Sequence, residues 1–506
     1  MKKRLLLLIP ILLISLSGCK KPRRSSGSDT ESTKTIEIYA TNDIHGAIME
    51  DGDRVGLSKL MTYLNDKGHD GNTLLIDQGD TWQGSIYSNY NHGELITDVM
   101  NYIHYDARSV GNHDFDWGVD YLKINTAKKY NGYAVPVLAG NVYDFDFDTK
   151  RVGANQQSEI GIKSVTYTLK NGLKVGILGG IGESQITTIT SSYTKDICFT
   201  NHIDFIKQEA THLKNDEHCD VIIASIHTGQ EDLLNNGLQN YVDLVLCGHT
   251  HKQESTHEGN LYYSQSKAYT QSVGHITLTY DINKKDVIKT SINTITGRQI
   301  SSMVTTIEPT IQQIVNSYNQ ECQVVADEVL ATNVSGAFYS SEQYPNLMCR
   351  AIFDECVSEN YNDVFLTYVN VARASNYSNA WTYADLYQAF PFDNQIYIAN
   401  ITGDELLREV KNYNYIYRNP SYTSNVINRN SIYKIAVIDY LYFHTNENRY
   451  YDYFPNTGGT SVTTLNKNYR EILRDWLKAK NYLAGGLSSS DYLSSLWAHD
   501  RTVFTA

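Results

Sequence analysis

Apolar runs alternate with amphipathic segments in the first part of the chain, from residue 35 to about residue 280. Short apolar runs bounded by turn residues are typical of buried strands, whereas apolar positions three and four residues apart are typical of helices. The predicted strands are 35–43, 73–80, 136–142, 174–180, 220–229 and 243–251. Helical patterns, as in 54–66 and 202–215, lie between several of them. This alternation predicts an α/β domain in which layered β-sheet is flanked by helices.

A longer helical pattern occurs around residues 305–330, with Pro309 near its start. It separates two parts of different composition, because residues 331–506 are rich in Tyr and Asn and mix strand and helix patterns. We therefore predict an N-terminal layered domain over 35–298, a connecting helix within 299–330, and a smaller α/β domain over 331–506.

The first residues resemble a targeting signal. Basic "MKKR" precedes an apolar stretch, Leu5 to Gly18, that is too short to span a bilayer comfortably. We expect a signal peptide over 1–18, and "LSGC" resembles a bacterial lipobox with Cys19 as the lipidated first residue of the mature protein. A plain secretory signal is the alternative. Residues 19–34 have the composition of a flexible tether, so the expected location is extracytoplasmic and anchored to the bacterial cell membrane.

Composition excludes some functions. The 506-residue chain is 41% hydrophobic and carries a formal net charge of −13, which argues against a nucleic-acid polymer as partner. The six cysteines after Cys19 have no zinc-ribbon spacing and are too few for a disulfide scaffold. A single Cys349–Cys356 disulfide is left open.

Five polar blocks each follow an apolar run: "TNDIHG" (41–46), "DQGDTWQG" (77–84), "GNHDFDWG" (111–118), "SIHTG" (225–229) and "CGHTH" (247–251). In open α/β sheets, ligands bind outside the carboxyl ends of the strands. Imidazole nitrogens combined with carboxylate oxygens suit Zn²⁺, Mn²⁺ or Fe²⁺ better than Ca²⁺. Each block alone could be a turn, a helix cap or a core histidine. Their recurrence in order, each at a predicted strand end, predicts a metal site.

The order Asp-x-His, Gly-Asp, Gly-Asn-His-Asp, His and Gly-His-x-His resembles the calcineurin-like metallophosphoesterases. "GNHDFDWG", "AGNVYD" (139–144) and the C-terminal part are similar to the secreted 5'-nucleotidase / 2',3'-cyclic phosphodiesterase family. The resemblance implies a hydrolase of phosphoric ester bonds that uses two divalent metal ions, Zn, Mn or similar. Two ions about 3.5–4 Å apart can clamp the attacking and leaving oxygens of an in-line displacement.

The resemblance also implies roles for individual residues. One metal ion would be held by Asp43, His45, Asp80 and His251, and the other by Asp80, Asn112, His227 and His249, with Asp80 shared. His113 would assist the transition state or the leaving group and be oriented by Asp116. Asp114 matches a variable acidic position and ranks below Asp116.

In the C-terminal part, "NVARASNYSNAWTYADLYQAFPFDNQ" (370–395) resembles the substrate-binding segment of that family. Arg373 would grip the substrate phosphate, Phe392 would stack on the base, and Asn370 belongs to the same motif. A core position is the alternative for Phe392. The chain departs from the family's pattern in two places. In the first, Val371 and Ala372 replace paired glycines. At the place of a second stacking aromatic the chain has Val462, with Tyr453 or Phe454 as loose substitutes.

These observations predict a surface-anchored phosphoesterase for nucleotides. Its substrates would be 5'-monophosphates, with 2',3'-cyclic phosphates or UDP-sugars as further candidates, and its role would be nucleotide salvage. Two alternatives stay open. The first is a metal-containing surface lipoprotein that binds a ligand without turnover. The second is a phosphoesterase for a non-nucleotide ester. The sequence does not define the oligomeric state.

Overall fold

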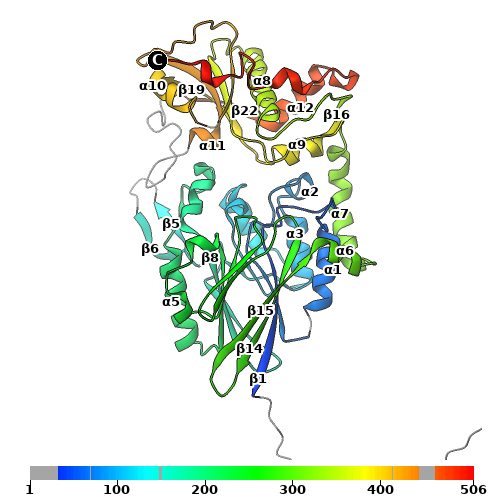
Figure 1. Ribbon diagram of the computed structural model, residues 1–506, viewed down its shortest axis with the longest axis vertical. Coiled ribbons are helices and arrows are strands. Elements are labelled where there is room, and N and C mark those ends of the chain that lie inside the picture. Colours follow the sequence, from blue (N-terminus) through cyan, green and yellow to red (C-terminus); the bar gives the residue numbers. More distant parts are fainter. Residues whose placement is uncertain (1–31, 69, 147–150, 413, 444–461) are drawn as a thin grey trace, which may run out of the picture.

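The computed structural model describes residues 32–506 except 69, 147–150, 413 and 444–461. The predicted signal peptide, Cys19, nearly all of the tether, and the pair Tyr453 and Phe454 therefore lie outside the described residues. Figure 1 shows a lower N-terminal part and an upper C-terminal part, with helix α7 at their side.

The N-terminal part contains two six-stranded mixed sheets. In order across the first sheet, the strands are β15 (Asp286–Thr296), β14 (Ser272–Asp281), β1 (Thr33–Thr41), β2 (Thr73–Asp77), β3 (Ala107–Ser109) and β4 (Val137–Leu138). Across the second, they are β12 (Glu254–Glu258), β13 (Leu261–Gln265), β11 (Leu244–Cys247), β10 (Val221–His227), β8 (Lys174–Ile181) and β7 (Ser164–Thr168). Strands β1 to β4 are parallel, and so are β8, β10, β11 and β13.

The two sheets pack face to face, and alternate residues of each strand supply the two sides of a sheet. Strand β10 is buried throughout. Its Val221 and Ile223 join the core between the sheets, whereas Ile222 and Ala224 pack toward helix α5 (His202–Asn215) on the outer face. Residues of α1 (Leu57–Lys67) and α3 (Glu94–Tyr102) form the core on the outer face of the first sheet. The result is a four-layer α/β/β/α arrangement.

The remaining elements of this part are short. They are helices α2 (Ile86–Asn89), α4 (Val119–Ala127) and α6 (Gly297–Met303), and a three-stranded sheet of β6 (Arg151–Gln157), β5 (Val142–Asp146) and β9 (Ile197–Phe199). The described residues of this part also contain five short 3-10 helices: η1 (Asn112–Phe115), η2 (Glu183–Thr188), η3 (Ser191–Tyr193), η4 (Gln230–Asp232) and η5 (Leu238–Asn240). Those of the C-terminal part contain η6 (Tyr482–Ala484), η7 (Ser489–Tyr492) and η8 (Arg501–Val503).

The C-terminal part is built on a five-stranded sheet. Its strands, in order, are β20 (Tyr415–Arg418), β17 (Leu366–Val369), β21 (Ile432–Ile438), β19 (Gln395–Thr402) and β22 (Thr463–Asn468), and β16 (Val329–Thr332) pairs with β18 (Ala380–Thr382). The helices are α8 (Gln343–Ser358), α9 (Tyr383–Ala389), α10 (Gly403–Glu409), α11 (Asp439–Tyr442) and α12 (Tyr469–Ala479). Helix α8 packs between α12 and strands β17 and β20.

Two segments tie the parts together. Helix α7 (Pro309–Ala326) buries Ile311 in the N-terminal core and Cys322 in the C-terminal core. Helix α2 belongs to the N-terminal part, yet Ile86 is buried in the C-terminal core and Asn89 Nδ2 donates to the carbonyl of Pro391 at 2.9 Å. The contact between the two parts therefore includes side chains that are buried in the hydrophobic cores.

The predicted α/β fold class is confirmed, whereas the exact domain boundaries stay a prediction. Five of the six predicted strands run past their observed carboxyl ends, since β1 ends at Thr41, β2 at Asp77, β4 at Leu138, β10 at His227 and β11 at Cys247. After β1, β2 and β11 the backbone changes sharply. The residues beyond have left-handed backbones that a strand excludes, as at Asp43, Asp80 and His249.

Two further observations concern cysteines and helices. Cys349 and Cys356 are buried and free, so the disulfide left open by the sequence is not formed. Within the described ranges, no helix has the length and apolar character needed to cross a bilayer.

Candidate functional site

The polar blocks meet at one end of the two sheets. Asp43 and His45 follow β1, Asp80 follows β2, and Asn112 follows β3, three parallel neighbours in the first sheet. His227 ends β10, and His249 and His251 follow β11, its parallel neighbour in the second sheet. Because parallel strands end at the same edge, the packing of the two sheets brings all seven side chains together.

These side chains form two clusters. The ligand atoms of Asp43, His45 and His251 lie within 4.8 Å of one another, and so do those of Asp80, His227 and His249. Asn112 joins the second cluster, because its Oδ1 lies 3.1 Å from His227 Nε2 and 3.0 Å from His249 Nδ1. The structure thus groups the residues as two candidate metal-binding clusters.

Asp80 lies between the clusters. Its Oδ2 is 3.6 Å from Nε2 of His45 in the first cluster and 3.3 Å from Nε2 of His227 in the second. This oxygen is buried and accepts no hydrogen bond from the described residues. Buried polar atoms are almost always satisfied, so an unpaired carboxylate oxygen facing both clusters indicates a missing partner. A divalent cation in each cluster, with Asp80 as a ligand common to both, fits this position, and the His, Asp and Asn donor set fits Zn²⁺ or Mn²⁺.

Burial controls the charge of three of the four histidines in the two clusters. It lowers the pKa of His249 to about 3 and that of His251 to about 4, and it also lowers the pKa of His45. These three imidazoles are therefore neutral at neutral pH, which is the form that binds metal ions. Burial alone would raise the pKa of Asp80, but the neighbouring histidines, His227 first, hold it well below its ordinary value.

The backbone around the clusters is unusual. Five of the seven predicted ligands have positive φ: Asp43 (49°), His45 (48°), Asp80 (54°), His249 (76°) and His251 (60°). Positive φ is uncommon outside glycine, and such strained residues concentrate at functional sites. These left-handed turns allow polar side chains that are close together in one short loop to point toward the two clusters.

Asp114 holds two of these loops together. Its carboxylate is 1% exposed and accepts hydrogen bonds from the main-chain N–H groups of Gly111 (2.8 Å), Asp80 (3.2 Å) and Thr81 (3.2 Å). Arg108 Nη1 lies 3.7 Å from the same carboxylate. The loops are so close that a Cβ on Gly111 would lie 2.2 Å from Asp80 Oδ1. Asp114 therefore fixes the position of Asp80 relative to Asn112, a role that no sequence motif revealed.

His113 is placed at the edge of the clusters by contacts from both parts of the chain. Its Nδ1 is 2.8 Å from Asp116 Oδ2, and its Nε2 is 3.2 Å from Arg373 Nη2. Burial opposes the charged imidazole, but the carboxylates of Asp116 and Asp80 outweigh it, and the pKa of His113 is raised. The ring of His113 also stacks on Phe392, with 5.3 Å between centroids.

A cleft of about 240 Å³ lies beside His113, between the two parts. This Phe392 cleft is lined by Asn112, His113, Asp116, Thr188, Thr190, His249, Asn370, Val371, Arg373, Phe392, Asn394 and Tyr440. All three predicted substrate residues, Asn370, Arg373 and Phe392, line it. Tyr440, an aromatic residue of α11, lines it as well and was not predicted. Val462 instead packs against the C-terminal core.

Residues 36–253 match the calcineurin-like phosphoesterase family. The matched range contains all the residues of both clusters. Among the relatives of the chain is the trifunctional nucleotide phosphoesterase protein YfkN of Bacillus subtilis, 25% identical over 404 residues, or 73% of this chain and 27% of that protein. The 5'-nucleotidase of Diplobatis ommata is 25% identical over 425 residues, or 73% of this chain and 69% of that one.

A solved structure, the 5'-nucleotidase precursor of Thermus thermophilus, superposes with a TM-score of 0.70 at 15% identity. It covers 88% of this chain and 97% of that chain. This likeness shows that the two share their fold. The chain spans only about a quarter of the length of the Bacillus subtilis relative.

Proposed function

We propose that the chain is a nucleotide phosphoesterase of the 5'-nucleotidase type, acting on nucleoside 5'-monophosphates. The observation that carries the proposal is the juxtaposition of two His/Asp clusters with a cleft lined by an arginine and two half-buried aromatic residues. Two relatives bear the names nucleotide phosphoesterase and 5'-nucleotidase, which supports the same substrate class. Release of nucleosides from impermeant nucleotides would serve nucleotide salvage.

The proposed ligand sets are Asp43, His45, Asp80 and His251 for one ion, and Asp80, Asn112, His227 and His249 for the other. The two divalent cations, Zn, Mn or similar, would supply activated water and positive charge for the developing transition state. The main-chain N–H of His113 donates to Asp80 Oδ1 at 2.7 Å, which leaves Oδ2 of Asp80 to face the histidines of both clusters.

His113, Asp116 and Arg373 would handle the substrate's charge. If Nδ1–H of His113 donates to Asp116, the Nε2 atom faces the guanidinium of Arg373 and the cleft. Arg373 would bind two phosphate oxygens with its planar fork. His113 would hold a proton for the leaving oxygen of the ester, with Asp116 fixing the direction of its ring.

A substrate panel tests the proposal. Wild-type protein with Mn²⁺ or Zn²⁺ would be offered 5'-AMP, 2',3'-cyclic AMP, UDP-glucose and simple sugar phosphates. We expect the highest kcat/KM for 5'-AMP. Bound metal without hydrolysis of any compound would favour a binding lipoprotein, and a preference for sugar phosphates would favour a non-nucleotide esterase.

The Phe392→Ala variant tests whether the base is recognised. We expect KM for 5'-AMP to rise about tenfold with little change in kcat, since stacking on one aromatic ring is worth about 1–3 kcal/mol. KM for p-nitrophenyl phosphate under the same conditions gives the comparison without a nucleobase. Phe392→Tyr is the matched control and should retain low KM. An equal loss on both substrates would show that Phe392 only packs against His113.

The anchor at Cys19 is part of the proposal, and it concerns residues outside the described ranges. We expect the wild-type protein in the membrane fraction of bacteria that express it, because a diacylated cysteine partitions strongly into lipid. Cys19→Ala should move it out of that fraction, and labelled palmitate should be incorporated only into the wild type. Equal membrane association of both proteins would contradict the lipid anchor.

A further inference from the structure

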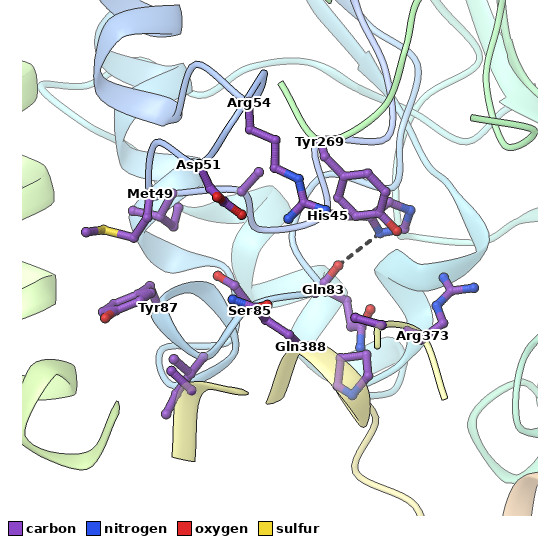
Figure 2. A pocket seen from close by; sticks show the side chains of 17 residues that line it. His45, Met49, Asp51, Arg54, Gln83, Ser85, Tyr87, Tyr269, Arg373 and Gln388 are labelled. Atoms are coloured by element: carbon purple, nitrogen blue, oxygen red, sulfur yellow. Dashed lines mark hydrogen bonds between the residues drawn. The ribbon is translucent and has the colours of Figure 1, made fainter. Parts of the chain in front are cut away.

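A second cleft, of about 120 Å³, also reaches Arg373 but borders the cluster of Asp43, His45 and His251. Figure 2 shows this Arg54 cleft, with Arg54 and Tyr269 on one side and Gln388 on the other. The loop that carries Arg54 and helix α9 therefore form opposite walls from the two parts of the chain. Neither Phe392, the residue predicted to stack on the base, nor Asn370 of the same motif lines it.

The cleft carries unbalanced positive charge. Arg54 and Arg373 both line it, and neither guanidinium forms an ion pair with a carboxylate among the described residues. The one carboxylate in the lining, Asp51, belongs to an exposed residue whose main chain pairs with that of Arg54. In a chain with a net charge of −13, two unpaired guanidiniums in one cleft favour an anionic ligand.

A buried donor in the same wall lacks a partner. Gln83 lines the cleft, is 1% exposed, and its Nε2 makes no hydrogen bond within the described part of the chain. Its main-chain oxygen is occupied by Nδ1 of His45 at 3.0 Å, which fixes the residue next to the cluster. A buried amide N–H without an acceptor is costly, so an acceptor oxygen from a ligand would satisfy it.

Arg54 is held in place by aromatic contacts. Its Cζ lies 4.7 Å from the centroid of the Tyr269 ring, and that ring lies 5.2 Å from the ring of His45 in a stacked arrangement. Stacking orients a guanidinium while leaving its N–H groups free to bind an oxyanion. The positive charge of Arg54 is therefore positioned close to the cluster instead of extending freely into solvent.

We propose that the Arg54 cleft is a second oxyanion subsite, which binds a phosphoryl group beside the reacting phosphate through Arg54, Arg373 and the amide of Gln83. This inference rests on the proposed function, because the reacting phosphate would lie at the clusters. The phosphoryl group has two possible sources with the same chemistry. It is either a second phosphate of the substrate or the inorganic phosphate that hydrolysis releases.

The first arm of the test uses UMP and UDP-glucose, which share a nucleoside. Water adds to one phosphorus of UDP-glucose while the anhydride P–O bond breaks. Its electron pair stays on the leaving oxygen, and UMP and glucose 1-phosphate are formed, with two protons released when both monoesters are fully ionised. If the substrate supplies the second phosphoryl group, Arg54→Ala lowers kcat/KM for UDP-glucose about tenfold or more and leaves that for UMP within about twofold.

The second arm measures inhibition of UMP hydrolysis by inorganic phosphate. If the released product occupies the subsite, Arg54→Ala raises the inhibition constant for phosphate about tenfold while kcat/KM for UMP is unchanged. Arg54→Lys, which keeps the charge, should retain part of either effect. Arg298→Ala, at an exposed arginine of the same part of the chain, is the control and should change neither quantity.

The outcomes separate the subsite from the proposed function. A selective change in either arm supports the subsite and identifies the source of its ligand. Wild-type protein that hydrolyses UMP but shows no Arg54 dependence in either arm overturns it. A parallel loss on UMP and UDP-glucose also overturns it, because a general disturbance of the site would explain the result. Absence of UMP hydrolysis by metal-loaded wild type would instead refute the proposed function.

Discussion

The Asp80→Asn variant is expected to lose phosphate release from 5'-AMP by on the order of a thousandfold, and to lose bound metal at both proposed positions. The reason is geometric. Asp80 Oδ2 faces His45 of one cluster and His227 of the other, at 3.6 and 3.3 Å. An amide in place of the carboxylate removes one negative charge that both cations would share. No other predicted ligand lies near imidazoles of both clusters in this way.

Metal content is the decisive measurement, because activity alone does not distinguish loss of one ion from loss of two. Elemental analysis after desalting should find about two ions per wild-type chain. Asp43→Asn should lose one of them, and Asp80→Asn more than one. Asp66→Asn, at a side chain that is 73% exposed, is the matched control. Full activity of chelator-treated wild type, or two retained ions in Asp80→Asn, would contradict the two-metal site.

The second large effect is expected at Asp114, which would touch neither ion. Its two oxygens accept hydrogen bonds from three main-chain N–H groups that belong to the loops of Asp80 and Asn112. In Asp114→Asn one oxygen becomes an NH2 donor, so at least one buried N–H loses its acceptor. We expect metal affinity and kcat/KM to fall about 10- to 100-fold, as for other groups that orient metal ligands.

Asp116→Asn provides the contrast two residues away. Asp116 contacts His113 and none of the loop N–H groups, so this variant should lower kcat by about a hundredfold and keep its metal affinity. Chelator competition measures the affinity, and thermal unfolding checks that Asp114→Asn is folded. Asp114→Glu should recover part of the lost affinity. Equal metal affinity in the Asp114→Asn and Asp116→Asn variants would refute the positioning role.

Sequence patterns predicted the α/β class and the polar side chains that meet at the strand ends. Both depend on local sequence, because an apolar run such as that of β10 indicates a buried strand and each polar block follows such a run directly. The ends of the strands were placed too late along the chain. The sequence does not distinguish an Asp or His with a left-handed backbone from one that continues a strand. Asp114 and Gln83 were not predicted as contributors. Their importance depends on main-chain N–H groups and clefts that form only when distant loops meet.

Tyr440 shows the same limit for the substrate cleft. It lies 48 residues after Phe392 along the chain, yet both rings line one cleft because α11 follows β21, which pairs with the strand after Phe392. One tyrosine among 39 in the chain could not be selected from sequence alone. The pairing of β19 with β21, and not composition, decides which aromatic residue lines the Phe392 cleft.

Helix α2 has a consequence for how the protein can be divided. Ile86 is an internal residue of the C-terminal core, although more than two hundred residues separate it from that part of the chain. Residues 331–506 expressed alone would therefore lack the side chains of Cys322, Ala326 and Leu330 from their core, and also that of Ile86, and the Pro391 carbonyl would lose its amide donor. A minimal independent fragment of the C-terminal part would have to carry a transplanted copy of residues 85–90.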